Sequence, residues 1–263
     1  MRATSLRALI FDVDGTLADT EEAHRVAFNL AFERCGLDWV WHPEDYRELL
    51  QVTGGKERIA RHVDTLPLPD AERLALIARV PEIHAEKTRF YRAFVAEGAV
   101  PLRPGVVRLI DEALAHDCRL GIASTTTAAN VDALLRASLG ERGAGLFGVV
   151  ACGDEVALKK PAPDIYRLAM RRLGVEPDAA VAFEDSVPGL RAALAAGLPT
   201  IVTPTFWSAD GDFNGALRLL PHLGDPHQPI AGEPGRQLAA APWLTFDELE
   251  NLWTMGARDA DRR

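Results

Sequence analysis

Five short apolar runs, none of them alternating with polar residues, constrain the fold of this 263-residue chain more than any other feature. A strand that is apolar at every position is buried on both faces, as in a parallel sheet covered by helices. Patterns of helical periodicity separate the runs, and strand–helix–strand repeats of this kind form right-handed crossovers. The sequence therefore predicts an α/β fold with a doubly wound, mostly parallel sheet. The expected strands are residues 8–11, 120–123, 148–151, 180–183 and 199–202.

One long stretch breaks this pattern. Between residues 21 and 98 no strand-like run occurs, while apolar residues recur at helical spacing from Ala23 to Ala31. An insert of about 80 residues is too long for a connecting loop. We therefore expect an all-helical cap domain, residues 19–98, inserted into an α/β core of residues 1–18 and 99–263. The expected cap helices are 23–31, 44–50, 56–63, 71–78 and 82–96, and the Gly- and Pro-rich segment 204–242 is expected to be irregular.

Composition excludes several classes of partner. With 38 acidic and 29 basic residues, the formal net charge is −9, which disfavours nucleic acid and anionic membranes as partners. Three widely spaced cysteines do not form a disulfide framework or a zinc site. Because neither a signal peptide nor a membrane-length apolar segment is evident, we expect a soluble, cytoplasmic, monomeric protein. If the ligand is an anion, a few Lys or Arg residues or a metal must supply positive charge locally.

The segment Asp12-Val-Asp-Gly-Thr16 directly follows the first expected strand. Ligands of open α/β sheets bind at the carboxyl ends of strands, and alternate side chains of an extended chain point the same way. Asp12 and Asp14 should therefore face one cleft. Two carboxylates about 4 Å apart repel by about 4 kcal/mol at an effective dielectric near 20, and a shared proton or a divalent cation removes that cost. The oxygen ligands favour Mg²⁺.

Polar residues also follow the later expected strands. Because the carboxyl ends of parallel strands meet at one edge, these side chains should converge with Asp12 and Asp14. Each alone also has a structural interpretation, such as capping the next helix. Together, and in this order, they predict an active site. They are Ser124 and Thr125 after the second strand, Lys160 after the third, and Glu184 and Asp185 after the fourth.

The combination of Asp12-Val-Asp-Gly-Thr16, Ser124, Lys160-Pro161 and Glu184-Asp185 resembles the helical-cap branch of the haloacid dehalogenase-like phosphohydrolase superfamily over nearly the whole chain. The resemblance implies that Asp12 attacks phosphorus to form an aspartyl-phosphate, and that Asp14 acts first as acid and then as base. It also implies that phosphoryl oxygens are held by Ser124 and Lys160. The implied Mg²⁺ ligands are Asp12, the backbone carbonyl of Asp14, Asp185 and, in support, Glu184.

Four segments, residues 18–24, 46–50, 53–59 and 159–166, resemble a narrower group, the Calvin-cycle operon phosphatases. This resemblance implies hydrolysis of xylulose 1,5-bisphosphate to xylulose 5-phosphate. A bisphosphate needs a second anion site, for which Lys56 and Arg58 are candidates near a Gly-Gly turn and a helix start. Glu21 and His24 are candidates for binding the sugar hydroxyls. Thr125 completes the expected substrate-binding set.

Two alternatives stay open. A β-phosphoglucomutase-like enzyme shares the cap, the nucleophile and the acid/base, but it returns the phosphoryl group to a sugar instead of to water. No residue of this sequence decides between the two outcomes. A non-catalytic phosphosugar-binding protein is disfavoured, because a binding module needs neither the nucleophile Asp12 nor the acid/base Asp14.

Overall fold

A parallel sheet forms the centre of the molecule. In the computed structural model, which describes residues 5–260, the sheet has six strands in the order β3-β2-β1-β4-β5-β6, and every neighbouring pair is parallel. The predicted doubly wound α/β fold is confirmed. The strands are β1 (Ala8–Phe11), β2 (Arg119–Ser124), β3 (Val149–Cys152), β4 (Ala180–Glu184), β5 (Thr200–Val202) and β6 (Arg218–Leu219).

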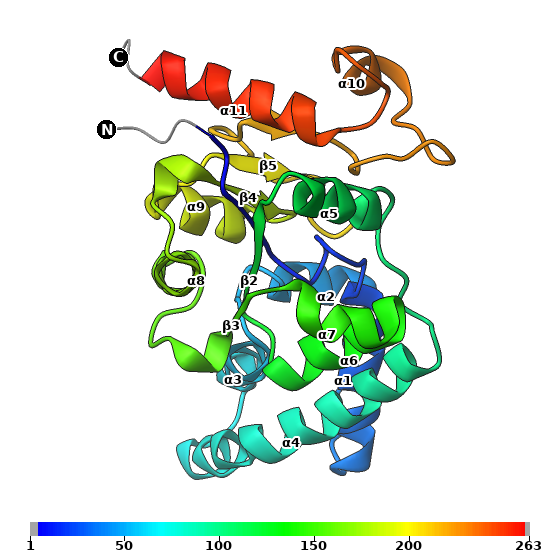
Figure 1. Cartoon of the computed structure of the whole chain (residues 1–263). Helices are drawn as coiled ribbons and strands as arrows, with labels where there is room; N and C mark the ends of the chain where they lie inside the picture. The colour runs from blue at the N-terminus through cyan, green and yellow to red at the C-terminus, as the bar shows by residue number, and fades with distance from the viewer. Residues whose placement is uncertain (1–4, 261–263) are drawn as a thin grey trace.

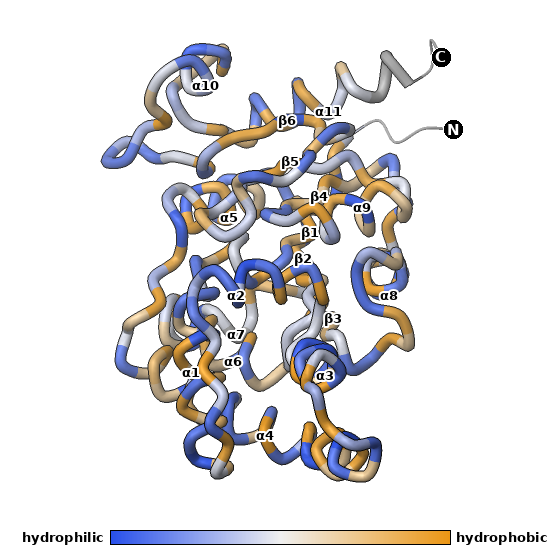
Figure 2. The backbone as a smooth tube through the Cα atoms, turned by 180° about the vertical axis from the view of Figure 1, so that it is seen from behind, coloured by the Kyte–Doolittle hydropathy of each residue, from blue (hydrophilic) through white to orange (hydrophobic). Residues whose placement is uncertain are grey.

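Helices cover both faces of the sheet (Figure 1). Leu9 and Phe11 point to the face packed by α5 (Val106–Ala115), α6 (Ala128–Leu139) and α11 (Phe246–Ala260). Ala8 and Ile10 point to the opposite face, which α8 (Asp164–Leu173) and α9 (Val187–Ala195) cover. Both faces of the sheet are therefore buried, which explains why polar and apolar residues do not alternate along the strands. Figure 2 shows hydrophobic residues gathered along these central strands.

Four helices between β1 and α5 form a separate layer below the sheet in Figure 1, and we call this layer the cap. They pack around a hydrophobic cluster that includes Phe28, Phe32, Trp41 and Tyr46. Figure 2 shows that α3 carries mostly hydrophilic residues outside that cluster. The all-helical insert is present, and the domain boundaries at 18/19 and 98/99 stay a prediction. The helices are α1 (Glu21–Arg34), α2 (Pro43–Leu49), α3 (Gly55–Thr65) and α4 (Asp70–Ala96).

Two expectations about secondary structure are wrong. The helices expected at 71–78 and 82–96 are one helix, α4, which continues through Pro81. Proline removes one backbone hydrogen bond, but contacts with α1, α3 and α6 along its length hold the helix together. The segment 204–242 contains β6 and the short helix α10 (Gly232–Arg236). Neither has a clear signal, since β6 is a two-residue strand and α10 contains Pro and Gly.

The remaining regular elements are short. The helix α7 spans Gly143–Leu146, and 3₁₀ helices span Gly140–Arg142, Gly153–Glu155 and Pro177–Ala179. Cys118 and Cys152 are buried free thiols, whereas the free thiol of Cys35 is partly exposed. Across residues 5–260, no helix combines the length and the apolar character needed to cross a membrane.

Arg103, just before α5, connects three loops at the carboxyl edge of the sheet. Its guanidinium donates hydrogen bonds to the carbonyl oxygens of Gly15, Thr203, Pro204 and Pro221. Arg103 therefore satisfies carbonyl groups of loops that follow β1, β5 and β6. Since buried carbonyl groups without partners are costly, this side chain fixes the loop after β1, which carries the Asp12–Asp14 segment.

We predict that Arg103→Met lowers the free energy of unfolding by about 3 kcal/mol, because the carbonyl groups of the buried residues Gly15 and Thr203 lose their donor together with those of Pro204 and Pro221. Urea denaturation followed by circular dichroism measures this change. The matched control is Arg136→Met, which removes an exposed i,i+4 pair with Asp132 and should cost about 0.5 kcal/mol. Equal losses in the two variants would contradict the role assigned to Arg103.

Candidate active site

The carboxyl edge of the sheet brings the expected polar residues together. Asp12 directly follows β1, Ser124 ends β2 and Glu184 ends β4, while Lys160 comes from the loop between β3 and α8. A cavity of about 220 Å³ lies between this edge and the cap. Of the expected site residues, only Glu184 does not line it. The lining therefore includes Asp12, Asp14, Glu21, His24, Lys56, Arg58, Ser124, Thr125, Lys160 and Asp185.

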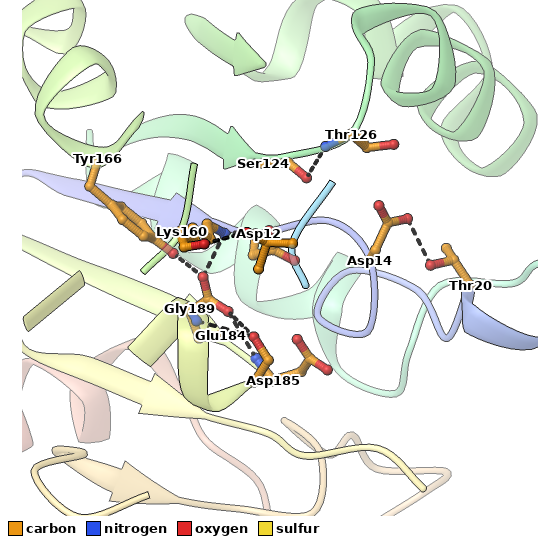
Figure 3. Close-up of polar contacts among 12 residues, drawn as sticks. Asp12, Asp14, Thr20, Ser124, Thr126, Lys160, Tyr166, Glu184, Asp185 and Gly189 are labelled. Atoms are coloured by element: carbon orange, nitrogen blue, oxygen red, sulfur yellow. Dashed lines mark hydrogen bonds and ion pairs between the residues drawn. The ribbon is translucent and has the colours of Figure 1, made fainter. Parts of the chain in front are cut away.

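Lys160 pairs with two buried carboxylates. Its Nζ lies 2.5 Å from Oδ1 of Asp12 and 2.6 Å from Oε1 of Glu184 (Figure 3). Burial lowers the pKa of Lys160, but these two carboxylates outweigh burial and hold the pKa above its ordinary value. The ammonium is therefore charged, and it points at the carboxylate oxygen of Asp12.

Asp12 is 6% exposed. Burial raises its pKa to about 8, against the attraction of Lys160 and with added repulsion from Glu184 and Asp14. A nucleophilic carboxylate must be ionised, so the site needs more positive charge than Lys160 supplies. The same is true of Asp185, whose pKa is raised well above its ordinary value by burial and then by Glu184 and Asp12.

These carboxylates fit a divalent cation. Asp12, Glu184 and Asp185 each offer one oxygen, and the three oxygens lie within 4.8 Å of one another in a buried setting. Three buried carboxylates with one ammonium leave a net negative charge, and oxygen-only ligands suit Mg²⁺. The carboxylate of Asp14 is not part of this cluster, which leaves its backbone carbonyl as the group the resemblance implied. The residues present fit the expected metal.

Tyr166 and Gly189 support Glu184, and neither was singled out in the sequence. The hydroxyl of Tyr166 donates a hydrogen bond to Oε1 of Glu184. A Cβ at position 189 would overlap the carboxylate of Glu184, so only glycine lets α9 approach so closely. Tyr166 lies six residues after Lys160, but its role depends on how α8 packs against the sheet.

Asp14 belongs to a different network from Asp12. Its Oδ1 accepts hydrogen bonds from Thr20 at 2.7 Å and from Nε2 of His24 at 2.8 Å. Burial raises the pKa of Asp14, but His24 and the two hydrogen bonds outweigh it and hold the pKa well below its ordinary value. Thr20 is the N-cap residue of α1, yet its side chain makes no capping bond and points to Asp14 instead (Figure 3).

Lys87, on α4, extends this network from the cap. Its Nζ lies 2.7 Å from Nδ1 of His24, and Lys87 is 4% exposed. The His24 ring stacks on Tyr91, with 4.0 Å between ring centroids. An ammonium only donates hydrogen bonds, so charged Lys87 leaves the ring proton of His24 on Nε2, facing Asp14. His24, expected to bind sugar hydroxyls, lies against Asp14.

Two of the expected substrate-binding residues are linked through Tyr46. The hydroxyl of Tyr46 donates to Oε2 of Glu21 at 2.8 Å and accepts from Nη1 of Arg58 at 2.9 Å. Arg58 is buried, and its Nε also donates to the carbonyl oxygen of Leu49. The guanidinium therefore lies at the cavity wall in a fixed position.

Lys56 and Thr125 are less constrained. Lys56, in the first turn of α3, is partly exposed and lies 3.2 Å from Asp154 of the core. Thr125 directly follows β2 and lines the cavity. Thr53, which also lines the cavity from the cap, donates a hydrogen bond from its hydroxyl to the backbone carbonyl of Lys160 in the core. The cap and the core therefore enclose the cavity from opposite sides.

Comparison with known proteins places this geometry in a family. The model of the haloacid dehalogenase-like hydrolases matches residues 6–197. Over 252 residues, the chain is 51% identical to the protein CbbY of Cupriavidus necator, which covers 95% of this chain and 98% of that protein.

Solved structures agree with the sequence match. The crystal structure of CbbY from Rhodobacter sphaeroides in complex with phosphate superposes with a TM-score of 0.76 at 51% identity, covering 82% of this chain and 94% of that one. A mutant of that protein in complex with xylulose 1,5-bisphosphate gives the same TM-score at 50% identity and the same coverage. The chain therefore belongs to the haloacid dehalogenase-like hydrolases and is a phosphoric monoester hydrolase.

Proposed function

We propose that this enzyme is a Mg²⁺-dependent sugar-phosphate phosphatase that hydrolyses xylulose 1,5-bisphosphate to xylulose 5-phosphate. The observation that carries the proposal is the position of Asp12, buried at the carboxyl edge of the sheet with the Lys160 ammonium 2.5 Å away. A relative that is 50% identical has been solved with xylulose 1,5-bisphosphate, which supports this choice of substrate. The monomeric state and the cytoplasmic location stay predictions.

In the first step, a carboxylate oxygen of Asp12 forms a bond to phosphorus while the bond from phosphorus to the sugar oxygen breaks. Asp14, which takes up a proton as the phosphate anion binds beside it, gives that proton to the departing oxygen. In the second step, Asp14 takes a proton from water as that water attacks phosphorus, and the carboxylate of Asp12 leaves. Dividing the hydrolysis into two steps avoids direct attack of unactivated water on a phosphate anion.

Lys160 and Ser124 provide contacts for the phosphoryl oxygens, since both line the cavity beside Asp12. Mg²⁺ held by Asp12, Glu184, Asp185 and the carbonyl of Asp14 would supply the charge that lets a carboxylate approach a phosphate anion. Burial of these groups strengthens each electrostatic interaction, because the effective dielectric is lower than in water.

The cap supplies groups for the rest of the substrate. Arg58 and Lys56 lie on α3, across the cavity from Asp12, and are proposed to bind the distal phosphate. Glu21 lines the same wall as a hydrogen-bond acceptor for sugar hydroxyls. A substrate with phosphate at both ends would then be held between the core and the cap, which suits a bisphosphate better than a small monophosphate.

A phosphate-release screen with Mg²⁺ over sugar mono- and bisphosphates tests the proposal, together with a coupled mutase assay on β-glucose 1-phosphate. We expect preferential release from xylulose 1,5-bisphosphate, and Asp12→Asn should lower kcat by at least about 10⁴-fold while leaving the circular dichroism spectrum unchanged. Isomerisation of glucose 1-phosphate without phosphate release would instead favour the mutase alternative. Binding without either reaction would favour a phosphosugar-binding protein.

We predict that Lys56→Ala and Arg58→Ala each raise the KM for the bisphosphate by about tenfold, because a charge-assisted hydrogen bond is lost. The KM for p-nitrophenyl phosphate, which has no distal phosphate, should change far less. Arg61→Ala is the matched control, since Arg61 is exposed on the same helix and does not line the cavity. Equal effects on both substrates would remove the distal-phosphate role.

We also predict an alkaline limb in the pH profile of kcat/KM. Burial lowers the pKa of Lys87 from 10.5 to about 8. Below that pH the ammonium donates to His24 and leaves the ring proton facing Asp14, whereas above it the neutral amine no longer fixes the tautomer. The value of kcat/KM should therefore fall as the pH rises through about 8.

Lys87→Met tests this assignment. The variant should have a kcat/KM about tenfold lower than wild type below pH 8 and should lose the alkaline limb. Arg89→Met, which removes an exposed residue of the same helix paired with Glu86, should keep the limb. A limb near pH 8 that persists in Lys87→Met would show that another group titrates there.

A further inference from the structure

The turn that follows β5, residues 205–211, reaches from the core into the cap. Trp207, in this turn, is 8% exposed and lines the cavity. Its side chain belongs to the hydrophobic cluster of the cap. The other buried members of this cluster all come from the cap, and they are Phe28, Phe32, Trp41, Tyr46, Ile59, Val80 and Ile83. A core residue therefore completes the hydrophobic centre of the cap.

The contact that matters most is between Trp207 and Tyr46. The two rings meet edge to face, with centroids 5.6 Å apart and an interplanar angle of 88°. Edge-to-face packing is favourable for aromatic pairs, and here it restricts the position of the Tyr46 ring. Tyr46 is fully buried and is not among the residues that line the cavity.

Tyr46 passes this restraint to residues that do line the cavity. Its hydroxyl bonds both Arg58 and Glu21, and the Arg58 guanidinium also lies over the Tyr46 ring at 5.1 Å. Moving the Tyr46 ring would therefore move a cation and an acceptor on the cap wall. Among the described residues, neither Arg58 nor Glu21 forms a hydrogen bond or an ion pair with Asp12 or Lys160.

The same turn is anchored at the core and to a second point on α2. Ser208 donates a hydrogen bond from its Oγ to Oδ2 of Asp185, and the backbone N–H of Trp207 donates to Oγ1 of Thr205. Asp210 lies 2.7 Å from Arg47, the residue after Tyr46. The turn thus has a fixed base beside the phosphate site. It contacts the helix that carries Tyr46 through Trp207, through Asp210 and through Phe206, whose ring lies 5.3 Å from the Arg47 guanidinium carbon.

We propose that Trp207 is a positioning residue for substrate specificity: through Tyr46, it holds Arg58 and Glu21 at the distance from Asp12 that a bisphosphate requires. The inference rests on the proposed function, because it assigns Arg58 to the distal phosphate and Glu21 to the sugar hydroxyls of that substrate. It makes selectivity depend on a residue of the core, although the groups that contact substrate belong to the cap.

Steady-state kinetics of Trp207→Leu on xylulose 1,5-bisphosphate and on p-nitrophenyl phosphate tests the inference. Leucine keeps an apolar side chain but loses the ring edge. We expect KM for the bisphosphate to rise about tenfold, with a much smaller change in kcat and in the KM for p-nitrophenyl phosphate. Trp207→Phe, which restores an aromatic ring, should recover most of the wild-type KM.

Two further variants separate positioning from stability. Trp39 packs edge to face on Phe32 in the same cluster but does not line the cavity, so Trp39→Leu should lower the thermal unfolding temperature without changing the KM ratio of the two substrates. Tyr46→Phe should raise KM for the bisphosphate like Trp207→Leu. The double variant should be no worse than either single variant, because both act through one hydroxyl.

Three results would overturn the inference: an unchanged KM ratio in Trp207→Leu, the same KM ratio change in Trp39→Leu, or independent effects of Trp207→Leu and Tyr46→Phe that multiply. Failure of the proposed function has a different signature. In that case wild-type enzyme itself would show no preference for xylulose 1,5-bisphosphate over p-nitrophenyl phosphate, whatever the variants do.

Discussion

The pairing of one buried ammonium, Lys160, with the carboxylates of Asp12 and Glu184 is the interaction on which the rest of the site depends. A buried charge without a partner costs several kcal/mol. Asp185 adds a third buried carboxylate, so Lys160 alone does not balance the group. Burial, with added repulsion from Glu184 and Asp14, raises the pKa of Asp12 to about 8, and the excess of carboxylates favours binding of a cation. Because these groups carry a net negative charge in a chain of net charge −9, Lys160 and a bound cation together would be needed to attract a phosphate anion.

The carboxylates of Asp12 and Asp14 lie in different surroundings, and their pKa values shift in opposite directions. Asp12 and Asp14 are two residues apart, yet Asp12 faces Lys160 while Asp14 faces Thr20 and His24. The pKa of Asp12 is raised by burial. Burial also acts to raise the pKa of Asp14, but the attraction of His24 and the hydrogen bonds from His24 and Thr20 outweigh it and lower the pKa. These shifts alone would leave Asp12 protonated and Asp14 ionised, the reverse of what a nucleophile and an acid need. A cation held by Asp12, Glu184 and Asp185 would lower the pKa of Asp12 and ionise it. The core supplies the surroundings of Asp12, the proposed nucleophile, and the cap supplies those of Asp14, the proposed proton carrier.

The core side of the site follows from the sequence because strand ends are predictable. Apolar runs locate the strands, and in a parallel sheet their carboxyl ends meet at one edge, which is why Asp12, Ser124 and Asp185 were identified together. The prediction of secondary structure from the sequence was wrong where the sequence pattern was weak. The two cases are the two-residue strand β6 and the helix α4, which continues through Pro81.

The cap side was harder to predict. Lys87 and Trp207 line the cavity, and Tyr46 bonds residues that line it, only because of the way the cap packs on the core. Helical periodicity shows which face of α4 is apolar, but it does not show that Lys87 lies buried against His24. Lys87 was therefore indistinguishable from a solvated helix residue in the sequence.

Chemical trapping of the covalent intermediate tests the central claim most directly. Enzyme with Mg²⁺ and xylulose 1,5-bisphosphate is quenched within a single turnover and treated with borohydride, which reduces an acyl phosphate to an alcohol. Peptide mass spectrometry then identifies the residue reduced. The account predicts homoserine at position 12 and unmodified Asp14. Phosphate release with no reduced residue, or reduction at any other carboxylate, would contradict it.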